Sequence, residues 1–332
     1  MPKGILERLA EGPVLGDGGY LLELEKRGYV QAGPFTPEVA IEHPEALAQL
    51  HREFLRAGAE VLQTMTFYAS DDKLATVGMA GKVDEINRTA VAIAREVAAE
   101  GDALVAGNLS LTWAYEPDET ASADHVRSLF DRQLQDQVDA GPPDFWIGET
   151  FSYLGEAMLF VERAKATGLP VMATMSFEQV EPLTYEGDTP GEAAKRLIDA
   201  GADIVGVNCL NGPDQQLPIA IQMREATTGG FVAAQPVAYR TTADAPDFTA
   251  GPRFPYELDP LQLSRLEMAD YARKAAEGGV NYIGSCCGAI QAHVRAMAKA
   301  LGKVPAEERA WKSESGRAMS AYEYHDHSET EA

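Results

Sequence analysis

The sequence predicts a (βα)8 barrel of the TIM type, and two observations lead to this fold class. Eight short apolar segments alternate with helical patterns along about 300 residues, as the repeating βα unit of such a barrel requires. Cysteines end both the sixth and the eighth segment, which places them together if the carboxyl ends of the strands share one mouth. A doubly wound open sheet is the competing architecture, and it requires that the first and last strands do not meet.

The eight expected strands are short and apolar. They are residues 14–18, 60–64, 103–110, 144–149, 170–175, 204–209, 231–237 and 282–287. No apolar run is long enough to cross a bilayer, and residues 1–9 lack the apolar stretch of a signal peptide.

The stretches between these strands carry the 3.6-residue spacing of amphipathic helices. In the first, Leu47, Leu50 and Phe54 repeat on one face, and Thr36 followed by Pro37 predicts a hydroxyl N-cap with proline at the first helical position. Later helices are expected to begin near Lys82, His125, Gly155, Gly191, Asp214, Leu263 and Gln291. The pattern fades near residue 303, so we expect a barrel over residues 1–303 and a short acidic C-terminal tail or arm over residues 304–332.

Composition excludes several classes of partner. The chain has 332 residues, of which 45% are hydrophobic, enough for one large core. Its formal net charge of −23 disfavours nucleic acid and anionic membranes, so the expected partners are small molecules or copies of the chain itself. Three cysteines cannot all pair as disulfides, which indicates a reducing compartment, and we expect a cytoplasmic protein.

The three cysteines predict a metal site. Cys209 ends the sixth strand, and Cys286 and Cys287 end the eighth, each in a glycine-flanked segment. Soft thiolate ligands select zinc, and three protein ligands leave the fourth tetrahedral position open, as in catalytic zinc sites. The alternative is that all three are small buried core residues.

Carboxylates follow two further strands. Asp17 lies in a glycine-rich stretch where a ligand can approach the backbone closely, although an Asx-type turn is the alternative. Glu149 ends the fourth strand, where an unpaired carboxylate is costly in low dielectric; a buried salt bridge is its alternative. Two carboxylates beside three thiolates would make a strongly negative site that attracts cations.

Aromatic residues gather after the first and second strands. Phe35 follows the first, and Phe67 and Tyr68 follow the second. Aromatic faces attract quaternary ammonium groups within about 6 Å of the ring centre, so these residues are candidates for a cation cage. Loop packing is the alternative for each of them alone.

Several separated motifs together resemble the betaine–homocysteine S-methyltransferases, within the wider homocysteine S-methyltransferase family. They are residues 3–9, 24–30, 51–58 and 66–70 and the two cysteine segments, and the resemblance covers residues 3–303. It implies a (βα)8 barrel in which Cys209, Cys286 and Cys287 hold zinc. It also implies that Asp17, Gly18, Thr64 and Glu149 seat homocysteine, with Asp17 and Glu149 as the acids of the catalytic site.

Two positions depart from the resemblance. Family members that act on glycine betaine carry tryptophan where Phe35 stands and tyrosine where Thr150 follows Glu149. Losing an indole N–H and a phenol changes the shape and hydrogen bonding of the donor pocket. The expected reaction is methyl transfer from a betaine-type donor, with glycine betaine first, to homocysteine, which yields methionine and dimethylglycine. The alternatives are a sulfonium donor, such as S-methylmethionine or dimethylsulfoniopropionate, and a non-catalytic zinc or thiol sensor.

Overall fold

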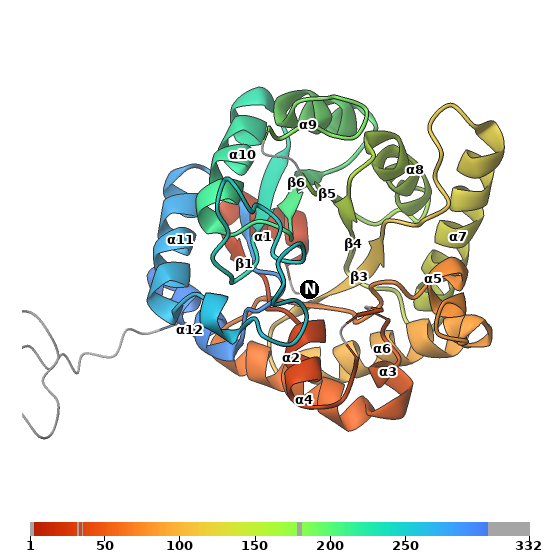
Figure 1. The fold of residues 1–332 in the computed structure, drawn as a ribbon, viewed down its shortest axis with the longest axis horizontal. Coiled ribbons are helices and arrows are strands. Elements are labelled where there is room, and N and C mark those ends of the chain that lie inside the picture. Colours follow the sequence, from red (N-terminus) through yellow and green to blue (C-terminus); the bar gives the residue numbers. More distant parts are fainter. Residues whose placement is uncertain (1–2, 32, 35, 178–180, 305–332) are drawn as a thin grey trace, which may run out of the picture.

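Eight parallel strands form a ring at the centre of the computed structural model, which describes residues 3–31, 33–34, 36–177 and 181–304 (Figure 1). The strands are β1 (Val14–Leu15), β2 (Val61–Gln63), β3 (Leu104–Ser110), β4 (Phe145–Phe151), β5 (Val171–Met175), β6 (Ile204–Asn208), β7 (Phe231–Gln235) and β8 (Tyr282–Ile283). All eight expected strands are confirmed. The open-sheet alternative is wrong, because Val14 pairs with Tyr282 and Leu15 with Ile283 in parallel register.

The ring closes between β1 and β2 with help from side chains. The backbone N–H of Glu60 donates to the carbonyl of Leu15 at 2.9 Å, and the N–H of Leu15 donates to the carboxylate of Glu60 at the same distance. At the other end of this seam, the N–H of Gln63 donates to Oδ2 of Asp17 at 2.7 Å. Two carboxylates therefore supplement the backbone bonding where the first and second strands meet.

Helices surround the strands on the outside of the ring (Figure 1). Those that pack around the barrel are α4 (Pro44–Ala57), α6 (Val83–Ala98), α7 (Thr120–Asp139), α8 (Leu154–Lys165), α9 (Pro190–Asp199), α10 (Pro213–Ala226), α11 (Arg265–Glu277) and α12 (Gln291–Ala300). Shorter helices and single turns in the loops are α2 (Leu21–Lys26), α3 (Val39–Glu42), α5 (Asp71–Ala75), η1 (Ala80–Lys82) and η2 (Asp259–Leu261). Most helices begin within two residues of the expected position, but α7 begins five residues before His125.

The predicted helix start at Thr36 and Pro37 is wrong. The short helix α3 begins at Val39 after Glu38, and α4 begins anew at Pro44 after His43. A proline inside a helix lacks the N–H for the helical bond and clashes with the preceding turn, so the chain breaks at His43 and Pro44 takes the first helical position instead. The Thr36 hydroxyl is buried without a hydrogen-bond partner among the described residues.

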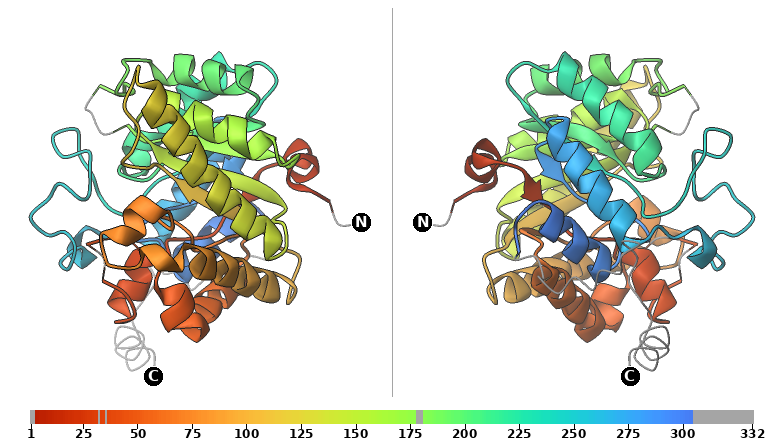
Figure 2. Two further views of the ribbon diagram at one scale, coloured as in Figure 1. Left: turned by 90° about the vertical axis from the view of Figure 1, so that its right-hand side faces the viewer. Right: turned by 90° about the vertical axis from the view of Figure 1, so that its left-hand side faces the viewer.

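A separate apolar core fills the inside of the ring. Val61, Leu104, Phe145 and Ile204 are among the side chains that point inward from the strands. The N-terminal helix α1 (Ile5–Glu11) adds Ile5 and Leu9 to this core, so it closes the amino-terminal end of the barrel. Figure 2 shows α1 at one end of the molecule and the long segment between β7 and η2 at the opposite end, where the strands have their carboxyl ends.

The C-terminal tail expected at residues 304–332 lies outside the described residues, apart from Val304. Within the described ranges, no helix is both long enough and apolar enough to cross a membrane.

Candidate active site

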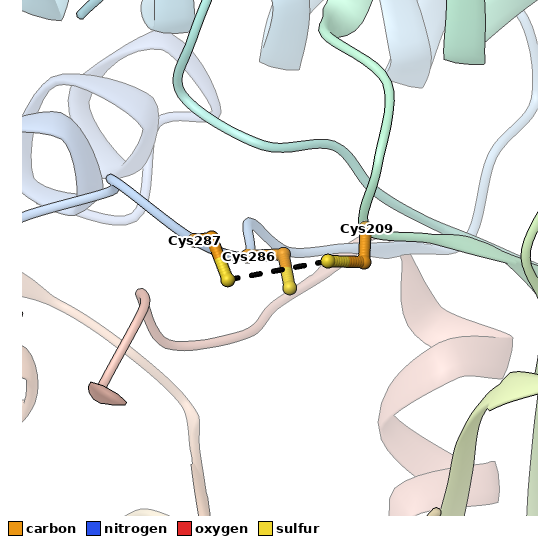
Figure 3. A group of neighbouring side chains, drawn as sticks. All are labelled: Cys209, Cys286 and Cys287. Atoms are coloured by element: carbon orange, nitrogen blue, oxygen red, sulfur yellow. Dashed lines mark hydrogen bonds between the residues drawn. The ribbon is translucent and has the colours of Figure 1, made fainter. Parts of the chain in front are cut away.

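Three cysteine thiols meet at the carboxyl ends of β6 and β8. Their Sγ atoms all lie within 4.8 Å of one another, with Cys209 and Cys287 separated by 4.0 Å. Figure 3 shows Cys209 reaching toward Cys286 and Cys287 from the opposite segment. A tetrahedral zinc with bonds of about 2.3 Å to sulfur needs sulfurs about 3.8 Å apart. The three thiols therefore fit one face of such a tetrahedron.

The neighbouring thiols also affect one another's protonation. The hydrogen bond with Cys209, followed by burial, raises the pKa of the Cys286 thiol well above its ordinary range. Without a metal, this cluster holds its protons at neutral pH. A bound metal would favour the thiolates, so its binding would release protons.

Strained backbone concentrates around these thiols. Five non-glycine residues in the described part of the chain have positive φ, and four of them line one cavity: Tyr68, Thr150, Cys209 and Leu210. Each such residue outside glycine costs on the order of 1–3 kcal/mol and persists only when its surroundings impose it. Here the strain turns side chains at three strand ends toward a common space.

Gly18 and Gly19 allow the first loop to lie directly against the eighth strand. A Cβ on Gly19 would come within 2.7 Å of the Cys286 carbonyl oxygen, and one on Gly18 within 2.5 Å of the Phe54 ring. No larger residue fits at either position without displacing the backbone or a core ring. The glycines predicted to allow close approach are therefore required by the backbone around the cysteines.

A cavity of ≈ 240 Å³ opens above the thiols. Its described lining includes all three cysteines and the predicted residues Asp17, Gly18, Thr64, Phe67, Tyr68, Glu149 and Thr150. Phe35 lies outside the described residues. Apart from Phe35, every residue expected at the site from the sequence thus borders one space.

Three amide groups hold Glu149. Its Oε1 accepts hydrogen bonds from Nε2 of Gln63 at 2.6 Å and Nδ2 of Asn108 at 2.8 Å, and its Oε2 accepts from Nδ2 of Asn208 at 3.1 Å. Burial raises the pKa of Glu149 to about 7. The buried salt bridge considered for Glu149 is absent among the described residues, where no lysine, arginine or histidine pairs with it. The carboxylate therefore lacks a cationic partner of its own.

Asp17 is the end of a buried chain of hydrogen bonds. Its Oδ2 accepts from the Tyr20 hydroxyl as well as from the N–H of Gln63, and the Tyr20 hydroxyl lies 2.9 Å from Nδ1 of His51. Burial raises the pKa of Asp17 to about 7 and lowers that of His51 to about 3. A neutral His51 can donate from Nδ1 to the Tyr20 oxygen, which leaves the phenol proton for Asp17. The bond from Gln63 crosses from β1 to β2, so Asp17 does more than the local turn considered from its sequence.

The two threonines differ in how their hydroxyls are used. The Thr64 hydroxyl accepts from the N–H of Asn108 at 2.9 Å and bonds to Thr66 and Gln137, all of them buried. Thr64 thus borders the cavity while its hydroxyl joins a network behind the strand. The Thr150 hydroxyl accepts from Nδ2 of Asn208 at 2.8 Å, and the Thr150 N–H donates to Oδ1 of the same residue.

Sequence patterns did not identify the residues that hold the carboxylates. Gln63 and Asn208 are the last residues of β2 and β6, and Asn108 lies within β3. Polar side chains at the carboxyl ends of barrel strands are candidates for the site by the same rule that identified Glu149. Tyr20 and His51 offered no such signal, because they come from helices α2 and α4 or the turn beside them.

The family of this chain follows from its sequence as a whole. The described fold is that of a TIM-type barrel with a thiol cluster at its carboxyl-terminal mouth. The model of the family described as Homocysteine S-methyltransferase matches residues 14–301. The chain belongs to this family, which confirms the resemblance found in its motifs.

Two relatives illustrate what the family includes. Betaine–homocysteine S-methyltransferase 1 from Bos taurus is 48% identical over 313 residues, covering 90% of this chain and 75% of the relative. S-methylmethionine–homocysteine S-methyltransferase BHMT2 from Pongo abelii is 44% identical over 312 residues, covering 90% and 81%. These two names give different methyl donors at similar levels of identity, so identity alone does not separate the donors.

Among solved structures, the homocysteine methyltransferase MmuM from Escherichia coli in its metallated form shares the fold. It superposes with a TM-score of 0.71 at 21% sequence identity, covering 89% of this chain and 99% of that protein. At this level of identity the match supports the barrel architecture.

Proposed function

We propose that this chain transfers a methyl group from a betaine-type quaternary ammonium donor, with glycine betaine first, to homocysteine at a zinc site. The products are methionine and dimethylglycine. One observation carries the proposal: three converging thiols, two buried carboxylates and aromatic residues border a single cavity in a chain of the homocysteine S-methyltransferase family.

Cys209, Cys286 and Cys287 would hold the zinc, and their spacing supports this assignment. Zinc with an open fourth position favours the deprotonated form of a thiol ligand, and so would supply the homocysteine sulfur as a nucleophile at neutral pH. The thiol proton leaves to solvent when homocysteine binds. Zinc is the metal expected from three soft thiolate ligands.

Glu149 and Asp17 are suited to bind the ammonium group of homocysteine. Both are buried at the cavity wall, and Glu149 is held by amides that leave its charge uncompensated. An incoming ammonium would favour the ionised carboxylates, whose ligand-free pKa values lie near 7 because of burial. Gly18 and Thr64 contribute to the same wall chiefly through their backbone, since the Thr64 hydroxyl is engaged elsewhere.

Methyl transfer itself requires little acid or base chemistry from the protein. The homocysteine sulfur forms a bond to the methyl carbon while the carbon–nitrogen bond of the donor breaks, and the amine leaves neutral with the electron pair. An anionic nucleophile and a cationic donor lose charge together in the transition state, so a cavity that excludes water favours the reaction. The walls of the cavity then contribute by aligning the two reactants.

A sulfonium donor is the second candidate, and the 44% identity to a relative named for S-methylmethionine favours retaining it. Purified zinc-loaded protein should be assayed for methionine formation from homocysteine with glycine betaine, proline betaine, S-methylmethionine and dimethylsulfoniopropionate. We expect glycine betaine to give the highest kcat/KM. A higher value for a sulfonium compound would identify that compound, and not glycine betaine, as the methyl donor. Absence of methionine with every donor would overturn the enzymatic proposal in favour of a sensor.

A further inference from the structure

Lys73 in α5 is the only fully buried lysine or arginine among the described residues. Its Nζ has no hydrogen-bond partner in the described part of the chain. Instead, Nζ lies 4.1 Å from the centre of the Tyr68 ring and 3.2 Å from the centre of the Trp113 ring. The ammonium thus occupies an aromatic cage formed by these two residues.

The Tyr68 ring has two close neighbours, the Phe67 ring and the Lys73 ammonium. Phe67 stacks on Tyr68 with ring centres 4.2 Å apart and an angle of 22° between the planes. Phe67 and the Lys73 ammonium each lie about 4 Å from the centre of the Tyr68 ring. Phe67, Tyr68, Lys73 and Trp113 form a continuous column, and a ligand cation cannot enter the Tyr68–Trp113 cage while Lys73 fills it.

Neighbouring loops hold Trp113 in place over Lys73. The backbone N–H of Trp113 donates to Oδ2 of Asp72 at 3.1 Å. One residue earlier, the N–H and hydroxyl of Thr112 both donate to Oε1 of Glu156 at 2.6 Å. The Trp113 side chain is 59% exposed, so it forms the cover between the ammonium and solvent.

Asp72 and Glu156 are the acids whose charges act on Lys73, but neither forms an ion pair with it among the described residues. Asp72 and Glu156 favour its protonated form, against the burial that lowers the pKa of Lys73 to about 7. Their carboxylates are engaged by Ser70, Trp113 and Thr112 instead. A further anion near Lys73 would therefore stabilise the ammonium.

The described lining of the cavity has no cationic side chain, so Lys73 is of interest as a nearby positive charge. The cavity's described lining contains Asp17, Glu149 and three cysteines, and no lysine, arginine or histidine. Glycine betaine and dimethylsulfoniopropionate each carry a carboxylate besides the onium group, and this carboxylate must find a favourable place in the same cavity. Tyr68 lines the cavity, and Nζ of Lys73 lies 4.1 Å from the centre of its ring. Because charges interact strongly where the dielectric constant is low, a cation at this position attracts the carboxylate of a donor and repels the onium group.

We propose that Lys73 is a positioning and specificity-determining residue for the methyl donor, filling the Tyr68–Trp113 cage with the protein's own cation. It turns the onium group of the donor away from this cage, toward the thiols, and draws the donor's carboxylate toward Tyr68. The site thereby selects onium donors that carry a carboxylate over those that lack one. This inference rests on the proposed methyl transfer.

Two sulfonium compounds that differ only in the carboxylate test the proposal: dimethylsulfoniopropionate and ethyldimethylsulfonium. The ratio of their kcat/KM values should be measured at pH 6.5 in the zinc-loaded parent protein and in Lys73→Met and Lys73→Arg variants. Methionine packs well against aromatic rings but carries no charge. We expect Lys73→Met to lower the ratio by about tenfold or more, the order expected of one charge–charge interaction at an effective dielectric constant of about 20. Lys73→Arg should retain most of the preference, and homocysteine affinity should be unchanged in both.

A second variant and a second measurement keep the test decisive. Trp113→Ala changes an exposed side chain, so it should leave the fold intact while admitting water to Lys73, and we expect it to lower the ratio several-fold. Calorimetric binding of the two compounds gives the same comparison without turnover. If the parent forms no methionine from any donor, the proposed function fails, while the binding ratio still decides the role of Lys73. Equal losses for both compounds in Lys73→Met, or an unchanged ratio, would overturn the role proposed for Lys73.

Discussion

Nδ2 of Asn208 lies 3.1 Å from Oε2 of Glu149, and the next residue in the chain is Cys209. The same amide group donates to the Thr150 hydroxyl at 2.8 Å, and its oxygen accepts from the Thr150 N–H and from the Thr174 hydroxyl. Its orientation is therefore determined by four hydrogen bonds. One side chain links the end of the strand that carries the first proposed zinc ligand to the carboxylate proposed to bind homocysteine.

This link predicts that Asn208 affects homocysteine more than metal. Asn208→Leu removes one of the three donors to Glu149 and leaves the Thr150 N–H without its acceptor. We expect homocysteine affinity to fall by about 1–2 kcal/mol, the usual loss when a buried hydrogen bond is broken from one side. Calorimetry with homocysteine checks this, with zinc content measured on the same samples. Asn208→Asp should weaken binding further through repulsion of Glu149, and equal affinity in all three proteins would contradict the role given to Asn208.

A second prediction concerns pH and the stability of the ligand-free protein. Burial raises the pKa of Glu149 from its ordinary value to about 7, so the folded chain holds this proton more tightly than the unfolded chain. Its contribution to the free energy of unfolding is therefore lost as pH rises from about 4.5 to about 7. Glu149→Gln has no such titration. The difference in Tm, variant minus parent, should become more positive between pH 5 and pH 8 in calorimetric scans, whatever its value at pH 5. A difference that is constant with pH would mean that Glu149 is ionised in the ligand-free protein throughout this range.

The donor half of the cavity gives a third prediction. One face of the Phe67 ring stacks on Tyr68, and Phe67 also lines the cavity. Phe67→Ala should raise KM for the methyl donor, because a cation–π contact contributes about 0.5–2 kcal/mol. Homocysteine affinity serves as the internal control and should remain within about twofold. Equal weakening of both substrates would indicate that Phe67 supports the whole cavity by packing.

The cysteines give a fourth prediction. Cys209→Ala, Cys286→Ala and Cys287→Ala should each lower zinc content below one ion per chain and abolish methionine formation, because two thiolates do not complete a stable site. Metal analysis after dialysis and the donor assay measure the two effects. Full activity in a metal-free preparation of the parent would exclude the zinc mechanism.

Local sequence signals predicted the barrel well because the strands are short apolar runs that alternate with helical patterns, and because strand ends meet at one mouth. Cys209 and Glu149 could be placed at that mouth for the same reason. The expected single helix from Thr36 was wrong because Pro44, eight residues later, ends the short helix α3 and starts α4 anew. Lys73 could not be identified, since Asp71, Asp72 and Lys73 resemble the exposed first turn of a helix. Its burial depends on Trp113, which lies forty residues later in the chain. Amide pairs such as Asn208 with Glu149 likewise depend on which strands neighbour one another across the barrel.

In the proposed mechanism, the homocysteine sulfur completes a zinc site made of Cys209, Cys286 and Cys287. X-ray absorption at the zinc edge counts the sulfur neighbours of the metal in the purified protein, before and after homocysteine is added. We expect three sulfur neighbours without homocysteine and four with it, with the same count of three restored by washing out the substrate. A sulfur count that does not change when homocysteine binds would contradict it.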